Sequence, residues 1–83
     1  MDYLRDYVVR AVGDSSGSIR WAASVTASSA REAFRRAVRI CPYPPAGFLW
    51  TVFRQLSGGQ QAVLEAQGDR VIWCGEDRFY DYL

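Results

Sequence analysis

Hydrophobic and polar positions alternate along two stretches near the start of the chain, residues 3–12 and 18–26. The apolar residues that share one side of the extended chain are Tyr7, Val9 and Ala11 in the first stretch and Ile19, Trp21, Ala23 and Val25 in the second. Alternation with a period of two is typical of a strand that buries one face. Residues 13–17, GDSSG, have the composition of a turn. Together the two stretches predict a β-hairpin.

The period changes to that of a helix in residues 28–40, SSAREAFRRAVRI. Ser29 stands in the N-cap position, and Glu32 falls at the third helical position, which completes a capping box. Apolar residues then recur at three- and four-residue spacing and predict one buried stripe: Ala30, Ala33, Phe34, Ala37, Val38 and Cys41. The small alanines suit a helix that lies close on a sheet. The prolines of residues 41–47, CPYPPAG, end the helix because proline lacks the amide hydrogen.

Three more strands are predicted in the second half of the chain. Residues 48–56, FLWTVFRQL, are apolar on both sides, which indicates a central strand buried on both faces. Glycine-containing turns then separate strands at residues 61–67 and 70–74. No element is assigned to residues 75–83. The predicted fold is an α+β single domain, residues 1–83, in which an antiparallel sheet of about five strands (ββαβββ) carries one helix on a face.

The composition argues against an enzyme. The sequence holds no His, no Lys and no Asn, and all ten of its positive charges are Arg. Without imidazole it lacks the commonest general base near neutral pH, and without lysine it lacks a Schiff-base or phosphate-loop amine. We therefore expect a non-enzymatic protein with no catalytic residues and no cofactor. The Asp, Glu, Cys, Tyr and Ser residues leave a hydrolase or metal enzyme as a distant alternative.

The cysteines and the N-terminus bear on location. Cys41 and Cys74 are 33 positions apart, which fits neither a CxxC motif nor a metal-ligand spacing. We expect two reduced, partly buried thiols, with a single disulfide as the alternative. The N-terminus, MDYLRDYVVR, has acids where a signal peptide has basic residues, and no apolar run approaches the ~18 residues of a membrane span. A cytoplasmic location, in a bacterium or a phage-infected host cell, is expected, with no membrane association.

Four arginines gather on the predicted helix. Arg31, Arg35 and Arg39 follow i, i+4, i+8 spacing and are expected to stack on one side, with Arg36 beside them. Glu32 is the only acid of this helix. Guanidinium groups pair with carboxylate or phosphate through two parallel hydrogen bonds, so the face is a candidate site for an acidic partner. The alternative is a solvated face that pairs with acids elsewhere, since the net charge is only +1.

Aromatic side chains are more numerous than so small a core can hide. Trp21, Trp50 and Trp73 lie in predicted strands and are expected in the core. The aromatic residues of the proline loop and the C-terminal segment are expected at the surface, where aromatic groups beside arginines are typical interface anchors. The complete set of candidate partner-binding residues is Arg31, Arg35, Arg36, Arg39, Tyr43, Phe79, Tyr80 and Tyr82.

Acidic residues cluster toward the C-terminus. They are Asp69, Glu76, Asp77 and Asp81, and they lie beside Arg70 and Arg78 in the sequence. A carboxylate cluster can bind a metal ion, but this one lacks a partner nucleophile. Surface ion pairs are expected here, and no metal site.

The stretch SSAREAFRRA, followed by AVLEAQGDRVIWCGEDRFYDYL, resembles some small phage-encoded anti-CRISPR proteins of the type I class in its layout. This resemblance implies an inhibitor that binds a Cas subunit of a type I surveillance complex near its nucleic-acid path. One alternative is a small arginine-rich nucleic-acid-binding domain, which the near-neutral charge disfavours. Another is an accessory protein–protein interaction module, a monomer or a homodimer that pairs through a sheet edge.

Overall fold

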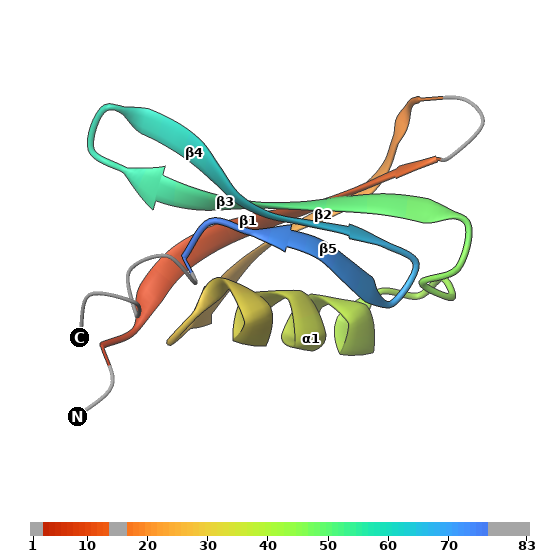
Figure 1. Cartoon of the computed structure of the whole chain (residues 1–83), viewed down its shortest axis with the longest axis horizontal. Helices are drawn as coiled ribbons and strands as arrows, with labels where there is room; N and C mark the ends of the chain where they lie inside the picture. The colour runs from red at the N-terminus through yellow and green to blue at the C-terminus, as the bar shows by residue number, and fades with distance from the viewer. Residues whose placement is uncertain (1–2, 14–16, 77–83) are drawn as a thin grey trace.

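Five strands form one antiparallel sheet, and a single helix lies across one of its faces (Figure 1). The computed structural model describes residues 3–13 and 17–76. The elements follow in the order β1 (Arg5–Gly13), β2 (Ile19–Ala27), α1 (Ala30–Ile40), β3 (Phe48–Leu56), β4 (Gly59–Gln67) and β5 (Arg70–Cys74). The predicted α+β class and the ββαβββ order are confirmed, and the ends of the elements agree with the prediction to within two residues.

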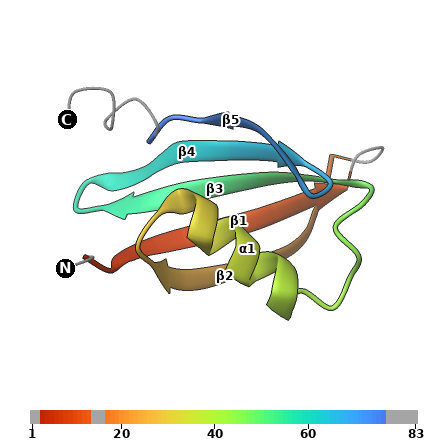
Figure 2. The same cartoon turned by 60° about the horizontal axis from the view of Figure 1, so that its bottom comes forward.

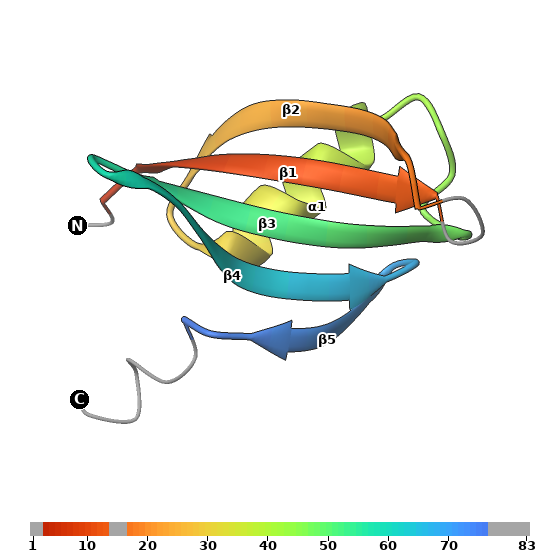
Figure 3. The same cartoon turned by 90° about the horizontal axis from the view of Figure 1, so that it is seen from above.

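The strands lie in the spatial order β2-β1-β3-β4-β5, so β3 is central, as predicted, and β2 and β5 form the edges (Figure 3). Each neighbouring pair is antiparallel. The helix packs against β1, β2, β3 and β4 and covers a single face of the sheet (Figure 2). No helix within residues 3–13 and 17–76 has the length and apolar character needed to cross a membrane.

The helix lies close to the sheet because its inward side is mostly alanine. Ala30, Ala33 and Ala37 are fully buried. At the start of the helix, Ser29 Oγ accepts a hydrogen bond from the Glu32 amide at 3.1 Å, as the capping box predicts. The Glu32 carboxylate in turn accepts from the amide of Ser28, one residue before the N-cap, at 2.9 Å. The helix ends at Ile40, before the first proline.

Trp50 is the centre of the core between helix and sheet. Its ring makes edge-to-face contacts with Phe34 of the helix at 5.7 Å, with Trp21 at 6.1 Å and with Phe48 at 6.1 Å. Its indole Nε1 donates to the Pro45 carbonyl at 3.3 Å, so the polar atom of the buried ring is satisfied. Residues from β1, β3 and β4 complete the buried layer: Tyr7, Val9, Ala11, Val52, Leu64 and Ala66.

The prediction that β3 is buried on both faces is wrong. Trp50 and Val52 point to the helix and are buried, whereas Leu49 on the other face is 39% exposed. Residues 3–13 and 17–76 contain only one helix to cover a sheet with two faces. We call the uncovered side the open face. It carries both apolar and polar side chains, and no element of the described residues lies over it.

Two irregularities in the strands place side chains on the opposite face of the sheet from the one predicted. Between β1 and β2 the register shifts, so Trp21 opposes Ala11 but Ile19 opposes Val12. Cross-strand partners share a face, so Ile19 lies on the open face and is 57% exposed, not buried beside Trp21. An extra residue in a strand reverses the alternation beyond it, and a simple period-two pattern misses this reversal.

Trp73 is also outside the core, contrary to the prediction. It opposes Glu65, and Val71 opposes Ala66, which leaves Ile72 as the extra residue of a bulge in β5. Glu65 lies on the open face, so Trp73 lies there too and is 40% exposed. Its ring packs along Gly75, where an added Cβ would come within 3.0 Å of the indole carbons. A glycine at position 75 therefore makes room for this ring.

Candidate partner-binding surfaces

A groove of about 450 Å³ lies on the solvent side of the helix. Its lining residues are Ser28, Ser29, Glu32, Arg35, Arg36 and Arg39, and we call it the arginine groove. The three arginines are exposed. They reach one groove because residues three and four apart are neighbours on a helix surface. The alanine stripe on the opposite side fixes this face outward.

Arg36 is held in place by two contacts. Its Nη2 forms an ion pair with Glu32 Oε1 at 2.6 Å, and its Nη1 donates to the Thr26 carbonyl at 2.7 Å. Hydrogen bonds from the Ser28 hydroxyl and amide, with a smaller contribution from Arg36, hold the pKa of Glu32 below its ordinary value. Glu32 is therefore ionised at neutral pH and offsets the charge of Arg36. Arg36 is thus paired within its own helix, and not with an acid from another segment as the alternative expectation had it.

Arg35 and Arg39 are in a different situation. Both are exposed, and neither forms an ion pair with any acid in residues 3–13 and 17–76. They are four residues apart, so their guanidinium groups lie on adjacent turns of the same helix face. Two uncompensated like charges at this spacing repel each other slightly, and an anion placed between them would remove that repulsion.

Arg31 does not line the groove. It is half-buried and already interacts within the chain. A helix advances about 100° per residue, so each step of four residues rotates the side chain by about 40°. Arg31 is consequently turned about 80° away from Arg39, toward the flank of the helix. The i, i+4, i+8 row drifts around the helix instead of forming the single stack that we expected.

Of the predicted aromatic anchors, only Tyr43 falls within the described residues, and it lies outside the arginine groove. Tyr43 follows the helix in the proline loop, is 48% exposed, and contacts the ring of Phe48 edge-to-face at 6.0 Å. It is not part of the groove lining. Phe79, Tyr80 and Tyr82 lie outside the described residues, so their predicted role stays a prediction.

Glu76 has a role that the sequence reading missed. We expected it to make a surface ion pair, but it is buried. Its Oε2 accepts a hydrogen bond from the Tyr7 hydroxyl at 2.7 Å, and its Oε1 accepts from the Ala30 amide at 2.8 Å. Ala30 is the first residue of α1, where a negative charge is favoured by the helix dipole. Glu76 therefore joins the end of the sheet to the start of the helix and to β1.

The Tyr7 hydroxyl is affected by this contact. Burial, together with the hydrogen bond to Glu76, raises the pKa of Tyr7 to about 12, while the Arg5 guanidinium acts in the opposite direction. Nothing in the local sequence indicates the triad of Tyr7, Glu76 and Ala30, because its members are 46 and 69 residues apart. The triad is a structural contact in which both donors and both acceptor oxygens are satisfied.

Other candidate chemistry is sparse. No group of three or more His, Cys, Asp or Glu side chains within residues 3–13 and 17–76 could hold a metal ion. Cys41 is buried and Cys74 is half-buried, and no disulfide joins the two, in line with the expected thiols. Asp69 is exposed at the β4–β5 turn, and Asp77 and Asp81 lie outside the described residues.

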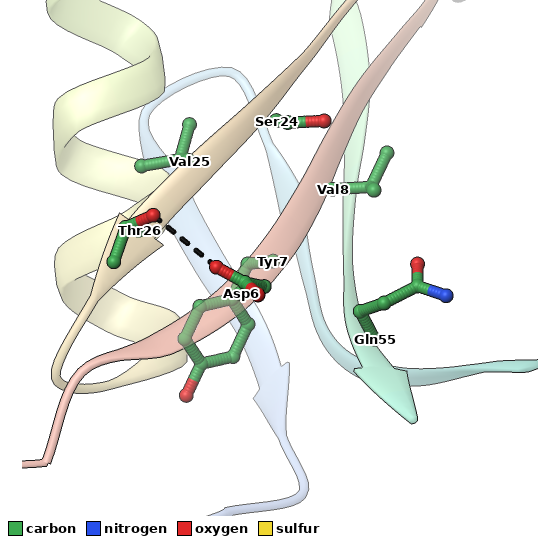
Figure 4. A pocket seen from close by; sticks show the side chains of 7 residues that line it. All are labelled: Asp6, Tyr7, Val8, Ser24, Val25, Thr26 and Gln55. Carbon is green, nitrogen blue, oxygen red and sulfur yellow. Dashed lines mark hydrogen bonds between the residues drawn. The ribbon is translucent and has the colours of Figure 1, made fainter. Parts of the chain in front are cut away.

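The open face is the second candidate surface, and its two ends differ. At one end a hollow of about 260 Å³ is lined from β1, β2 and the end of β3, and Thr26 Oγ1 donates there to Asp6 at 3.3 Å (Figure 4). At the other end a hollow of similar size is lined by Val12, Leu49 and Ile72 together with Thr51 and Glu65. The first end is mixed in polarity, and the second is mainly apolar.

Comparisons with protein-family models, curated proteins and solved structures find no match for this chain.

Proposed function

We propose that this chain is a non-enzymatic binding protein that holds an acidic surface of a protein partner in the arginine groove. The observation that carries the proposal is that Arg35 and Arg39 are exposed on adjacent turns and form no ion pair with the acids of the described residues. A carboxylate placed between them accepts charge-assisted hydrogen bonds, the stronger class of such bonds. Arginine is also among the residues that dominate binding energy at protein interfaces.

The fixed Arg36 supports this use of the groove. Because Glu32 and the Thr26 carbonyl already orient its guanidinium, it forms one wall of the groove without losing further side-chain entropy on binding. Glu32 neutralises this wall, so the unpaired positive charge is concentrated at Arg35 and Arg39. The groove therefore favours a small acidic patch over a broad anionic surface.

In the specific form of the proposal, the partner is a Cas subunit of a type I surveillance complex, and the chain is a phage-type inhibitor. This form follows from the resemblance in the order of elements and from the lack of His and Lys. A nucleic-acid path is itself basic. The arginine groove therefore requires an acidic patch on the subunit beside that path, and binding there would obstruct the nucleic acid sterically.

The test is a binding titration of purified surveillance subunits with the wild-type chain and with Arg35→Glu/Arg39→Glu. Arg70→Glu is the matched control, because Arg70 is exposed on β5 and is not part of the groove. We expect the double variant to weaken the complex at least tenfold and to restore target-DNA binding by the surveillance complex. The control should stay within about twofold of wild type, and circular dichroism should show all three chains folded.

Three outcomes oppose the proposal at different levels. If the wild-type chain binds no subunit, the inhibitor form is wrong. If the double variant binds as tightly as wild type, the arginine groove is not the contact surface. If the wild type instead binds duplex DNA with a log–log salt slope near −2.7, as about three released counterions predict, the partner is nucleic acid and not protein.

A further inference from the structure

The open face lies on the opposite side of the sheet from the arginine groove and carries its own pattern. The pairing register places Arg10, Thr51 and Glu65 in one row across β1, β3 and β4. Neighbouring strands are about 4.8 Å apart, so the backbone positions of Arg10 and Glu65 are roughly 10 Å apart, on either side of Thr51. The row thus carries a positive charge at one end and a negative charge at the other.

Neither charge of this row is neutralised by an ion pair within residues 3–13 and 17–76. The Arg10 guanidinium carbon lies 4.7 Å from the centre of the Phe53 ring, which fixes the side chain over the sheet by a cation–π contact. Glu65 is exposed. Both side chains therefore lie on the outer side of the sheet, where Arg10 is fixed by its contact with Phe53 and Glu65 extends into solvent.

Large apolar side chains surround this row toward one end of the face. Leu49 and Ile72 line the apolar hollow with Glu65, and Ile72 is 61% exposed. Ile19 and Trp73 share the face, as the register of their strands requires. Scattered apolar residues are normal on a protein surface, but a contiguous apolar group beside two unpaired charges is typical of an interaction site.

We propose that the open face binds the open face of a second copy of this chain. In the proposed dimer the twofold axis runs parallel to β3 and passes over Thr51. Rotation about this axis exchanges the β1 side with the β4 side, so Arg10 of each copy faces Glu65 of the other. One row of charges then forms two identical ion pairs, as a twofold-symmetric interface requires.

The shape of the sheet is compatible with this axis. The β3–β4 turn and the far ends of β1 and β2 both rise on the open side, which is the saddle of a twisted sheet (Figure 1). A twofold rotation about an axis along the strands places a second saddle-shaped sheet over the first, and the two surfaces then run parallel to each other. The two faces therefore keep a nearly constant separation, close to the ~10 Å of aligned sheet packing.

The size of the face is comparable with that of a stable interface. The molecule measures 38 by 23 Å in the view of Figure 3. A rectangle of these sides encloses roughly 900 Å² as an upper limit, and a stable interface buries about 800 Å² on each partner, so the dimer requires most of the open face. The dimer leaves the arginine grooves on its two outer sides, so the proposal does not depend on what the groove binds.

The experiment is sedimentation equilibrium of the full chain over a concentration series, with a charge-swap set of variants. We expect a reversible dimer with a dissociation constant in the micromolar range. Arg10→Glu and Glu65→Arg each place like charges opposite one another and should weaken the dimer at least tenfold. The double variant Arg10→Glu/Glu65→Arg restores opposite charges and should return the dissociation constant to within about threefold of wild type.

Two further variants identify the surface. Leu49→Asp places a charge in the central strand of the open face and should leave a folded monomer, as circular dichroism would verify. Arg39→Glu lies in the arginine groove and should leave the dimer unchanged, which separates this proposal from the proposed function. A wild-type chain that stays monomeric at about 1 mM overturns the dimer, including the case in which the chain's own C-terminal segment covers the face. If Leu49→Asp leaves the dissociation constant unchanged, the two copies pair through a sheet edge. If the double variant does not restore the dimer, the two faces pair in another register. Either result overturns the proposed interface.

Discussion

The two faces of the sheet are made by the same strands and differ both in composition and in what covers them. On β3, Trp50 and Val52 face the helix and are buried, while Leu49 and Thr51 alternate with them on the open face. Both sides of this strand include a large apolar side chain, but the open face also carries polar and charged groups such as Thr51 and Glu65. Leu49 is exposed because no second layer covers it, and it remains available for a partner.

The covered face is also stabilised by buried hydrogen bonds, which the open face lacks among the described residues. Glu76 joins the last strand to the start of the helix and to Tyr7 through two buried hydrogen bonds. Within residues 3–13 and 17–76, the open face has the exposed hydrogen bonds of Thr26 with Asp6 and of Gln60 with Gln55, and the Arg10–Phe53 contact near its middle. Changes on the covered face should thus lower the free energy of unfolding, and changes on the open face should mainly alter association.

The sharpest test of this comparison uses one substitution on each face. Leu64 is fully buried under the helix, whereas Leu49 is on the open face of the neighbouring strand. Leu64→Ala should lower the free energy of unfolding by about 2–5 kcal/mol, because it removes buried surface and leaves a cavity. Leu49→Ala should lower it by about 1 kcal/mol or less. Urea denaturation of both variants, at concentrations where the chain is monomeric, measures the difference.

Equal losses at the two positions would contradict the comparison, since they would mean that something covers Leu49 within a single chain. A loss at Leu49 that grows with protein concentration would instead reflect the dimer, because a partner that binds only the folded state stabilises it by mass action.

A second test measures how much the hydrogen bond between Tyr7 and Glu76 contributes to stability at alkaline pH. The folded-state pKa of Tyr7, about 12, lies above its ordinary value of 10.0. The stabilisation from Tyr7 is therefore complete below about pH 10 and is lost as the pH rises toward 12. Two pKa units set an upper limit of roughly 3 kcal/mol on this loss, which solvent screening of the hydroxyl reduces. The chain has no Lys, so no ammonium group titrates in this window to obscure the effect.

Thermal unfolding at several pH values between 9 and 12 measures this loss. Tyr7→Phe should be less stable at neutral pH, because Glu76 loses a buried hydrogen-bond donor, and should show a shallower decline above pH 10. Tyr43→Phe is the matched control, since Tyr43 is half exposed and the hydrogen bond to Glu76 belongs to Tyr7. An unchanged slope in Tyr7→Phe would show that Tyr7 is not the group whose ionisation limits stability.

Local patterns predicted much of this molecule, and distant contacts account for what they missed. The capping residue Ser29 and the alanine stripe are encoded within a few residues, so the helix could be placed from the sequence. The positions of Ile19 and Trp73 could not, because one extra residue in a strand leaves composition unchanged and reverses the facing. Glu76 was misassigned because its partners come from two other parts of the chain.

The candidate site was predicted only in part for a similar reason. The sequence identified Arg35, Arg36 and Arg39 as neighbours, since helical spacing fixes them. It could not show that Arg36 is already paired with Glu32 while Arg35 and Arg39 are not, because this depends on side-chain geometry and on a carbonyl from β2. The charged row of the open face depends on the strand register, which the sequence does not give.

The smallest expected effect lies at the N-cap of the helix, where a local contact of Ser29 adds to the buried contact of Glu76 with Ala30. Ser29→Ala removes the acceptor for the Glu32 amide and should cost about 1 kcal/mol, less than a change in the buried layer. Ser24→Ala, at an exposed position on β2, is the control and should be nearly neutral. The folded-state pKa of Glu32 is lowered by its bonds to Ser28, so this end of the helix should also weaken as the pH falls below the ordinary value of 4.5. Amide hydrogen exchange at the first turn of α1 measures both changes. If exchange there is as slow in Ser29→Ala as in wild type, the buried contact of Glu76 with Ala30 holds the helix start without help from the cap.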